Sequence, residues 1–330
     1  MSVQPSRRAF LSGQRTRVDP WLSFLAKLRA QAKGTLTLDS QFFEARAHWV
    51  PNTFNDIEVA RSLCHQFGVV LCLQGLEQAL DPKLSMLVVE PGQAWARPIP
   101  LDTTQGLWRF DAACSLQVLQ AAGVTAAQGA MPNQSLAKWF AQGTHHGIPL
   151  GGLASLGIDN IEMMFVDGTI EVLGAFGAQN SEPLRSLFTQ RNIPQLFEVA
   201  RQSRFSASLQ EVAAADNRAQ VWPNDCFRID ALVDHALGEP HLGQFFVGHG
   251  GRLGWLVAVT FRSVEQKTLL QEDGDKCHDR CHDRCNEKTS AHATLTSLID
   301  PDLIAADKNE VQHINQSIKN IFDSSRVFLP

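Results

Sequence analysis

The chain has 330 residues, of which 44% are hydrophobic and 19% are charged, and its formal net charge is −5. This charge offers no basic surface for nucleic acid or for an anionic membrane, and no stretch reaches the roughly 18 apolar residues of a membrane span. Seven cysteines, an odd number scattered along a long chain, are typical of a reducing compartment. We therefore expect a cytoplasmic globular protein, folded as one large domain or two modest ones, with no nucleic-acid partner and no membrane span.

The first 37 residues read as a basic arm and a helix. Residues 6–11 (SRRAFL) resemble a twin-arginine export motif, which requires an apolar stretch of about 7–15 residues immediately after it. Residues 12–19 are polar and charged instead. We therefore expect an arm that does not direct export, followed by an amphipathic helix at 21–32 that ends before Gly34.

Helix and strand patterns alternate through the next part of the chain. A helical pattern that stops at Gly68 is followed by a short apolar strand and a tight loop, which is half of a βαβ unit. Further on, two apolar runs flank Asp167-Gly168, the strongest short hairpin signal. The expected elements are strand and turn at 36–50, a helix at 55–67, strands at 69–73, 84–89 and 107–112, a helix at 116–122, and a hairpin of 163–166 with 170–173.

Residues 245–262 (FFVGHGGRLGWLVAVTFR) carry the densest glycine cluster of the chain. Glycines let the backbone take positive φ and approach a ligand without an intervening Cβ. The run 255–261 is apolar on both alternating faces, which predicts a strand buried on both sides. From composition alone, the glycines fit a ligand-binding loop or a tight turn in a core equally well.

This stretch resembles the signature "GSEGTLGIVTEATLR" of FAD-linked oxidases of the vanillyl-alcohol oxidase type, which include D-lactate dehydrogenases and the FAD subunits of glycolate oxidase. The family's Ser-Glu is replaced by His249-Gly250 here. The matching positions are Gly248, Gly251, Leu253, Gly254, Val257, Thr260 and Arg262.

Earlier segments resemble other motifs of this family in the same order. Residues 73–77 (LQGLE) stand where the family has a glycine loop that cradles the FAD pyrophosphate on backbone amides. Only Gly75 of those glycines is kept, and Glu77 adds a negative charge. The histidine that attaches FAD covalently in some members is absent, so the resemblance implies non-covalent FAD.

Residues 135–147 resemble the family loop "TIGGWVATGSHG", which touches the pyrophosphate and ribityl chain. Lys138 replaces a family glycine and would be either a cation beside the pyrophosphate or a solvated helix lysine. The adjacent His145-His146 read as loop residues rather than as a metal site. Residues 159–173 resemble "DNVLGLEVVLADGEVV", whose first strand lies under the flavin, and residues 228–232 resemble "YRLDALL". Together these resemblances cover about residues 45–262.

The C-terminal part holds 68 residues after Arg262, where the family has a much larger substrate-capping domain. Within it, Cys277, Cys281 and Cys285 lie four residues apart with two histidines between them. These thiols could bind zinc or an iron–sulfur cluster. The verbatim repeat of Cys-His-Asp-Arg in charged sequence also fits a duplicated loop, and we expect no metal there.

We therefore predict an α+β (mixed α/β) fold: an N-terminal arm and helix (1–37), a PCMH-type FAD-binding domain (38–262) with subdomains at about 38–127 and 128–262, and a shortened C-terminal segment (263–330). The implied function is that of an FAD-dependent oxidoreductase similar to 2-hydroxy-acid oxidases or dehydrogenases of glycolate or D-lactate. The chain would be a subunit of a larger complex, in which an iron–sulfur protein is the expected partner. The alternative is a degenerate, non-catalytic member that acts as a binding or scaffolding subunit.

No catalytic residue follows from the sequence, because the family supplies it from the cap. The resemblance implies that Gly251 and Gly254 matter more for FAD binding than any charged residue, and that replacing His249 has little effect. The expected FAD-binding residues are Gly75, Ser135, Leu136, Gly143, His145, Gly147, Asp159, Gly248, Gly250, Gly251, Gly254 and Val257.

Overall fold

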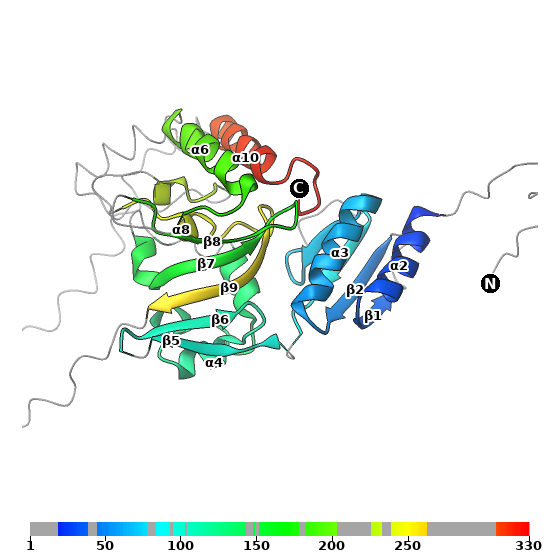
Figure 1. Cartoon of the computed structure of the whole chain (residues 1–330), viewed down its shortest axis with the longest axis horizontal. Coiled ribbons are helices and arrows are strands. Elements are labelled where there is room, and N and C mark those ends of the chain that lie inside the picture. Colours follow the sequence, from blue (N-terminus) through cyan, green and yellow to red (C-terminus); the bar gives the residue numbers. More distant parts are fainter. Residues whose placement is uncertain are drawn as a thin grey trace, which may run out of the picture.

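The computed structural model describes residues 19–38, 45–77, 84–92, 95–102, 104–142, 148, 152–177, 183–202, 226–232, 239–262 and 308–329. Two sheets organise these residues, and each has its own helices (Figure 1). The α+β class predicted from the sequence is confirmed. The arm at 1–18 and the cysteines at 277, 281 and 285 lie outside the described residues.

The first unit is a four-stranded sheet in the order β1-β2-β4-β3. Strands β2, β4 and β3 are parallel, and β1 pairs with β2 in the antiparallel sense. Helices α2 and α3 lie side by side next to this sheet (Figure 1). The bounds are α2 (Pro20–Gln31), β1 (Gly34–Leu38), β2 (Arg46–Pro51), α3 (Phe54–Phe67), β3 (Val70–Leu73) and β4 (Met86–Val89).

Local sequence signals determine where α3 begins and ends. Thr53 and Asp56 form a capping box, in which the Thr53 side chain accepts from the Asp56 amide and the Asp56 side chain accepts from the Thr53 amide. Gly68 ends the helix in the left-handed conformation at φ 64°. The next residues then enter β3, which is buried along its whole length.

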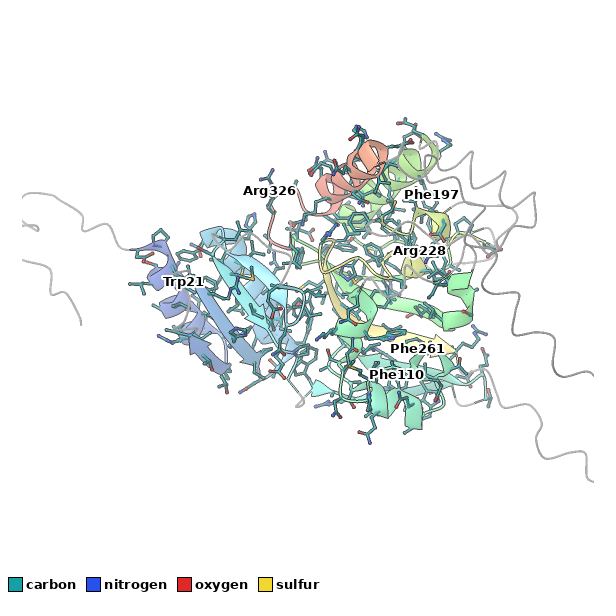
Figure 2. The ribbon with its side chains drawn as sticks, turned by 180° about the vertical axis from the view of Figure 1, so that it is seen from behind. Trp21, Phe110, Phe197, Arg228, Phe261 and Arg326 are labelled. Carbon is teal, nitrogen blue, oxygen red and sulfur yellow. The ribbon has the colours of Figure 1, made fainter. Side chains whose placement is uncertain are left out.

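The second unit is a five-stranded antiparallel sheet in the order β5-β6-β9-β7-β8. Its central strand β9 is buried at every position except the last, as predicted for a strand covered on both sides. Phe110 of β6 and Phe261 of β9 lie side by side in this core, with ring centroids 6.1 Å apart (Figure 2). The bounds are β5 (Pro98–Asp102), β6 (Leu107–Asp111), β7 (Ile158–Met164), β8 (Ile170–Gly174) and β9 (Trp255–Arg262).

Short and long helices complete the second unit. Helices α6 and α10 lie side by side (Figure 1), and Phe322 at the end of α10 packs against Phe165, Phe188, Phe245 and Phe246. The bounds are α4 (Leu116–Ala121), α5 (Leu136–Ala141), α6 (Leu187–Gln202), α8 (Leu242–Phe245) and α10 (Lys308–Phe322), with 3₁₀ turns η3 (Thr125–Ala127), η5 (Gly152–Leu156) and η6 (Ile229–Leu232).

One strand lies in a different unit from the one that its sequence position suggests. The predicted strand at 107–112 is placed in the first subdomain by chain order, whereas β6 pairs with β9 in the second sheet. The break between the sheets therefore falls between β4 and β5. Chain order misplaces β6 because its partner, β9, follows much later in the sequence, after β7, β8 and α6. The domain bounds 1–37, 38–262 and 263–330 remain a prediction.

The segment that resembles "YRLDALL" has an internal structural role. The Arg228 guanidinium donates to both carboxylate oxygens of Asp230, with Nε–Oδ1 at 2.9 Å and the second bond at 2.6 Å. Both side chains are fully buried. Arg228, which is labelled in Figure 2, also donates to the carbonyl of Ile148. The pair thus ties η6 to the interior of the second unit.

Residues 323–329, which follow α10, connect the two units. The amide of Leu71 on β3 donates to the carbonyl of Val327 at 2.7 Å, and the amide of Leu329 donates to the carbonyl of Gly251 at 3.4 Å. The Leu329 side chain packs with Val70, Cys72, Met86 and Val88 of the first sheet. Among the described helices, none is both long and apolar enough to cross a membrane.

Candidate functional site

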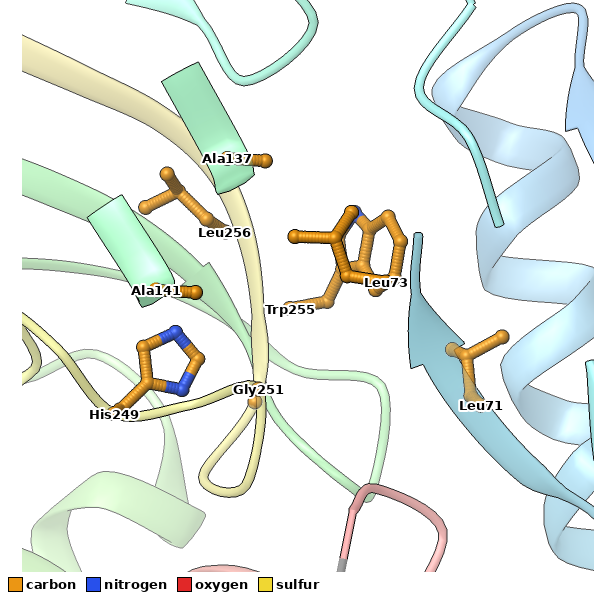
Figure 3. Close-up of a pocket in the computed structure, with 9 residues that line it drawn as sticks. Leu71, Leu73, Ala137, Ala141, His249, Gly251, Trp255 and Leu256 are labelled. Carbon is orange, nitrogen blue, oxygen red and sulfur yellow. The ribbon is translucent and has the colours of Figure 1, made fainter. Parts of the chain in front are cut away.

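A cavity lies where the first sheet meets the glycine turn and α5 of the second unit (Figure 3). Figure 3 shows Leu71 and Leu73 of β3 on one side, and the His249 ring with the Ala141 end of α5 on the other. Its walls are largely apolar, as in many ligand pockets. The lining residues are Leu71, Leu73, Ala137, Ala141, His249, Gly251, Gly254, Trp255 and Leu256.

Hydrogen bonds to α5 set the shape of the glycine turn. Gly248, Gly250 and Gly251 have φ angles of 73°, 64° and 71°. The amide of Gly248 donates to the carbonyl of Phe140, and that of Gly250 donates to the carbonyl of Ala141, both at 2.8 Å. The last turn of α5 therefore holds the turn in the left-handed conformation that glycine tolerates best.

The two glycines expected to matter most have different surroundings. A Cβ at Gly254 would lie 2.9 Å from the carbonyl oxygen of Met164, so glycine is needed there for packing against the end of β7. A Cβ at Gly251 would lie 3.2 Å from Leu76 and 3.4 Å from Leu329, on the side of the first unit. Both glycines line the cavity. Of the two alternatives left open by composition, the close contact at Gly254 fits the tight turn in a core, whereas Gly251 has more room and fits a ligand-binding loop.

His249 lines the cavity, although the sequence resemblance predicts that replacing it has little effect on FAD binding. Its side chain is buried, with an exposed fraction of 2%, and its Nδ1 has no hydrogen-bond partner among the described residues. Burial, together with the positive charges of Arg252 and Lys319, lowers the pKa of His249 to about 3. The imidazole is therefore neutral near pH 7 and has one donor and one acceptor nitrogen.

Trp255 provides a second buried polar atom without a partner. Its indole Nε1 has no hydrogen-bond acceptor among the described residues, and the residue is 4% exposed. Leaving a buried polar group unpaired costs about 1–3 kcal/mol, so such groups usually meet a ligand or an ordered water. Both atoms lie on this cavity, where a ligand or an ordered water could bond them. The sequence signal for this role of His249 was its position between two glycines, where the signature that residues 245–262 resemble has serine.

The cavity is small in this arrangement of the two units. Its empty space amounts to about 290 Å³, and part of this space is open to solvent. The enclosed part has room for about one water molecule. A flavin ring is larger than this enclosed part. Binding one therefore requires the walls contributed by β3 and by the glycine turn to move apart.

The turn after β3 holds Gly75 at φ 86°. The Gly75 amide donates to Oε2 of Glu77, so an internal carboxylate already occupies this amide. A Cβ at Gly75 would lie 2.5 Å from Nζ of Lys138, which places the α5 ammonium against the turn from across the boundary between the units. Gly75 thus lies between an internal anion and a cation.

The start of α5 carries two further expected FAD contacts, Ser135 and Leu136. The Ser135 hydroxyl caps the helix by accepting from the Lys138 amide at 3.3 Å. The amide of Leu136 donates to the carbonyl of Cys114 at 2.8 Å, and the amide of Ala137 to that of Ala112 at 2.9 Å. These groups of the first turn are therefore all engaged within the protein.

The remaining expected residues are not brought together with the cavity. Asp159 on β7 pairs with Arg262 at 2.7 Å and lines a different hollow, of about 470 Å³, next to β8. Val257 is buried in β9, and its carbonyl accepts from the Ala112 amide. Gly143, His145 and Gly147 lie outside the described residues, and the described part of the chain contains no cluster of three metal-binding side chains.

The described residues suit the two parts of FAD differently. An uncharged planar ring is matched by apolar walls with the unpaired polar atoms of His249 and Trp255. A pyrophosphate is not matched at Gly75, because the Glu77 carboxylate holds the amide that a phosphate would need. The chemistry of the cavity therefore fits the ring of the cofactor, and the Gly75 turn as it stands does not fit its phosphates.

Comparisons with known proteins find distant structural likenesses. No family model and no curated protein matches the chain. An alkyldihydroxyacetonephosphate synthase matches at a TM-score of 0.41 and 10% identity, over 76% of this chain and 42% of that one. BBE-like 1 of Physcomitrella patens matches at 0.40 and 14%, over 72% and 44%, and a chitooligosaccharide oxidase at 0.38 and 10%, over 74% and 43%. The chain spans less than half the length of these proteins, and likenesses this distant carry no argument about the site.

Proposed function

We propose that the chain binds FAD non-covalently between its two units and serves as the flavin-carrying subunit of an oxidoreductase. The observation that carries this proposal is the pair of unpaired buried polar atoms, His249 Nδ1 and Trp255 Nε1, on one apolar cavity beside the glycine turn. The order of the motif resemblances along residues 45–262 supports it. We extend the proposal to a small 2-hydroxy acid as substrate, to an iron–sulfur partner subunit and to a cytoplasmic location.

The residues of the cavity would each have a defined task. Leu73, Ala141 and Leu256 exclude water from the ring. The neutral imidazole of His249 and the indole N–H of Trp255 orient it through hydrogen bonds. Bound FAD supplies a hydride acceptor, which no amino-acid side chain provides.

The test is the purification of the full chain under native conditions. The proposal predicts a yellow protein, or one that turns yellow with added FAD, and FAD that is released into solution when the protein is denatured. A protein that stays colourless after incubation with excess FAD contradicts the proposal. That result supports the alternative, a non-catalytic binding or scaffolding subunit.

A further inference from the structure

The turn after β3 has the features of an anion-binding position. It lies at the carboxyl end of a parallel strand, where ligands of α/β sheets bind. Gly75 takes a positive φ of 86° there, and its amide donates to a carboxylate. The ammonium of Lys138 lies against the same glycine. A backbone amide and a cation therefore lie on two sides of the same glycine, and both are groups that bind phosphate.

The anion now held at this position is part of the chain. Glu77 reaches back two residues to the Gly75 amide, so the carboxylate and an incoming phosphate would compete for the same donor. They would also repel each other, because both carry negative charge and would lie only a few ångströms apart. A ligand without phosphate would meet neither effect.

We infer that Glu77 is an internal competitor for phosphate at the Gly75 turn, and that it determines how strongly the site discriminates against phosphate-bearing ligands. This inference rests on the proposed function only in placing the flavin phosphates at this turn. Glu77 lowers the affinity for FAD and for inorganic pyrophosphate, and leaves the affinity for riboflavin, which has the ring without phosphate, unchanged. Lys138 supplies the cation to which the phosphate binds once the carboxylate is neutralised.

The experiment compares the full-length wild type with Glu77→Gln, which keeps the size of the side chain and removes its charge. Glu90→Gln is the matched control, because Glu90 is an exposed carboxylate just after β4 of the same sheet. Calorimetry measures the dissociation constants of pyrophosphate, FAD and riboflavin for each protein, and circular dichroism verifies folding. We expect Glu77→Gln to bind pyrophosphate and FAD about tenfold more tightly, to bind riboflavin unchanged, and to lose the gain when Lys138→Met is added.

Each outcome decides one claim. Equal pyrophosphate affinities in folded Glu77→Gln and wild type overturn the inference, and FAD binding by both would leave the proposed function intact. If no variant binds FAD or riboflavin but Glu77→Gln gains affinity for pyrophosphate, the proposed function fails and the inference stands. An equal gain for riboflavin shows that Glu77 acts on the fold rather than on phosphate, and also overturns the inference.

Discussion

Lys319 and Asp323 form an ion pair inside the protein, with Nζ 2.5 Å from Oδ2 and exposed side-chain fractions of 9% and 0%. Lys319 also donates to the carbonyls of Arg252 and Leu329, and Asp323 accepts from the amides of Val327 and Phe328. Burial lowers the pKa of Lys319 and raises that of Asp323, and the mutual attraction of the pair opposes both shifts. The pair therefore holds residues 323–329 against the glycine turn.

Removing one member of this pair should cost much of the stability. Lys319→Met leaves Asp323 as an uncompensated buried carboxylate, and we expect the free energy of unfolding to fall by about 3 kcal/mol or more. The control is Arg201→Met, which breaks the exposed pair with Glu198 and should change stability by less than about 1 kcal/mol. Urea unfolding measures both. Equal small losses in the two variants would show that the buried pair does not hold the C-terminal segment.

His249 should make stability depend on pH. Its pKa of about 3 lies below the ordinary value of 6.5, so between these values the unfolded chain binds a proton that the folded protein does not. The free energy of unfolding therefore does not depend on this group well above pH 6.5. It falls as the pH decreases below that value, by about 2 kcal/mol at pH 5. His249→Gln removes the effect, so unfolding free energies of wild type and variant should draw together, or cross in favour of the variant, between pH 7 and pH 5. Exposed His65→Gln is the control, and a constant difference between wild type and His249→Gln over this range would contradict the burial of an unpaired imidazole.

Replacing Gly254 should lower the stability of the fold, whether or not a ligand is bound. The sequence resemblance predicts a role for Gly254 in FAD binding, whereas the structure places the Met164 carbonyl oxygen 2.9 Å from a Cβ added at this position. We expect even Gly254→Ala to lower the free energy of unfolding by about 1–3 kcal/mol. Gly129→Ala, at φ 80° with open space around the added Cβ, tests the backbone cost alone, which is about 1–2 kcal/mol. A fully stable Gly254→Ala would show that β7 and the glycine turn are not in such close contact.

Local signals in the sequence account for the parts that were predicted correctly. The Thr53–Asp56 capping box and Gly68 set both ends of α3, and Asp167-Gly168 sets the β7–β8 hairpin. Partners distant in the chain left no such signal. The pairing of β6 with β9 and the contact of Lys138 with the Gly75 turn both join residues far apart in sequence. The burial of His249 likewise depends on α5 and the C-terminal segment, so its sequence neighbours could not reveal it.

The cavity assigns His249 a larger role in flavin binding than the sequence resemblance does. His249→Phe keeps a ring in the site and removes the nitrogen atoms that would bond the ligand. We expect a roughly tenfold loss of FAD affinity, the usual scale for one unmade hydrogen bond in a buried site. Quenching of flavin fluorescence measures it, with His65→Phe as the exposed control. An unchanged dissociation constant would support the original expectation that His249 is dispensable.

The central claim is that flavin binds in the cavity between the two units. The most direct measurement is a calorimetric titration of FAD into the wild type and into Leu73→Trp, whose larger side chain fills the cavity from β3. Leu38→Trp is the control, because Leu38 is exposed on β1 of the same sheet. Our account predicts one FAD per chain for the wild type and for Leu38→Trp, and no binding by a folded Leu73→Trp. Absence of binding by the wild type, or undiminished binding by Leu73→Trp, would contradict it.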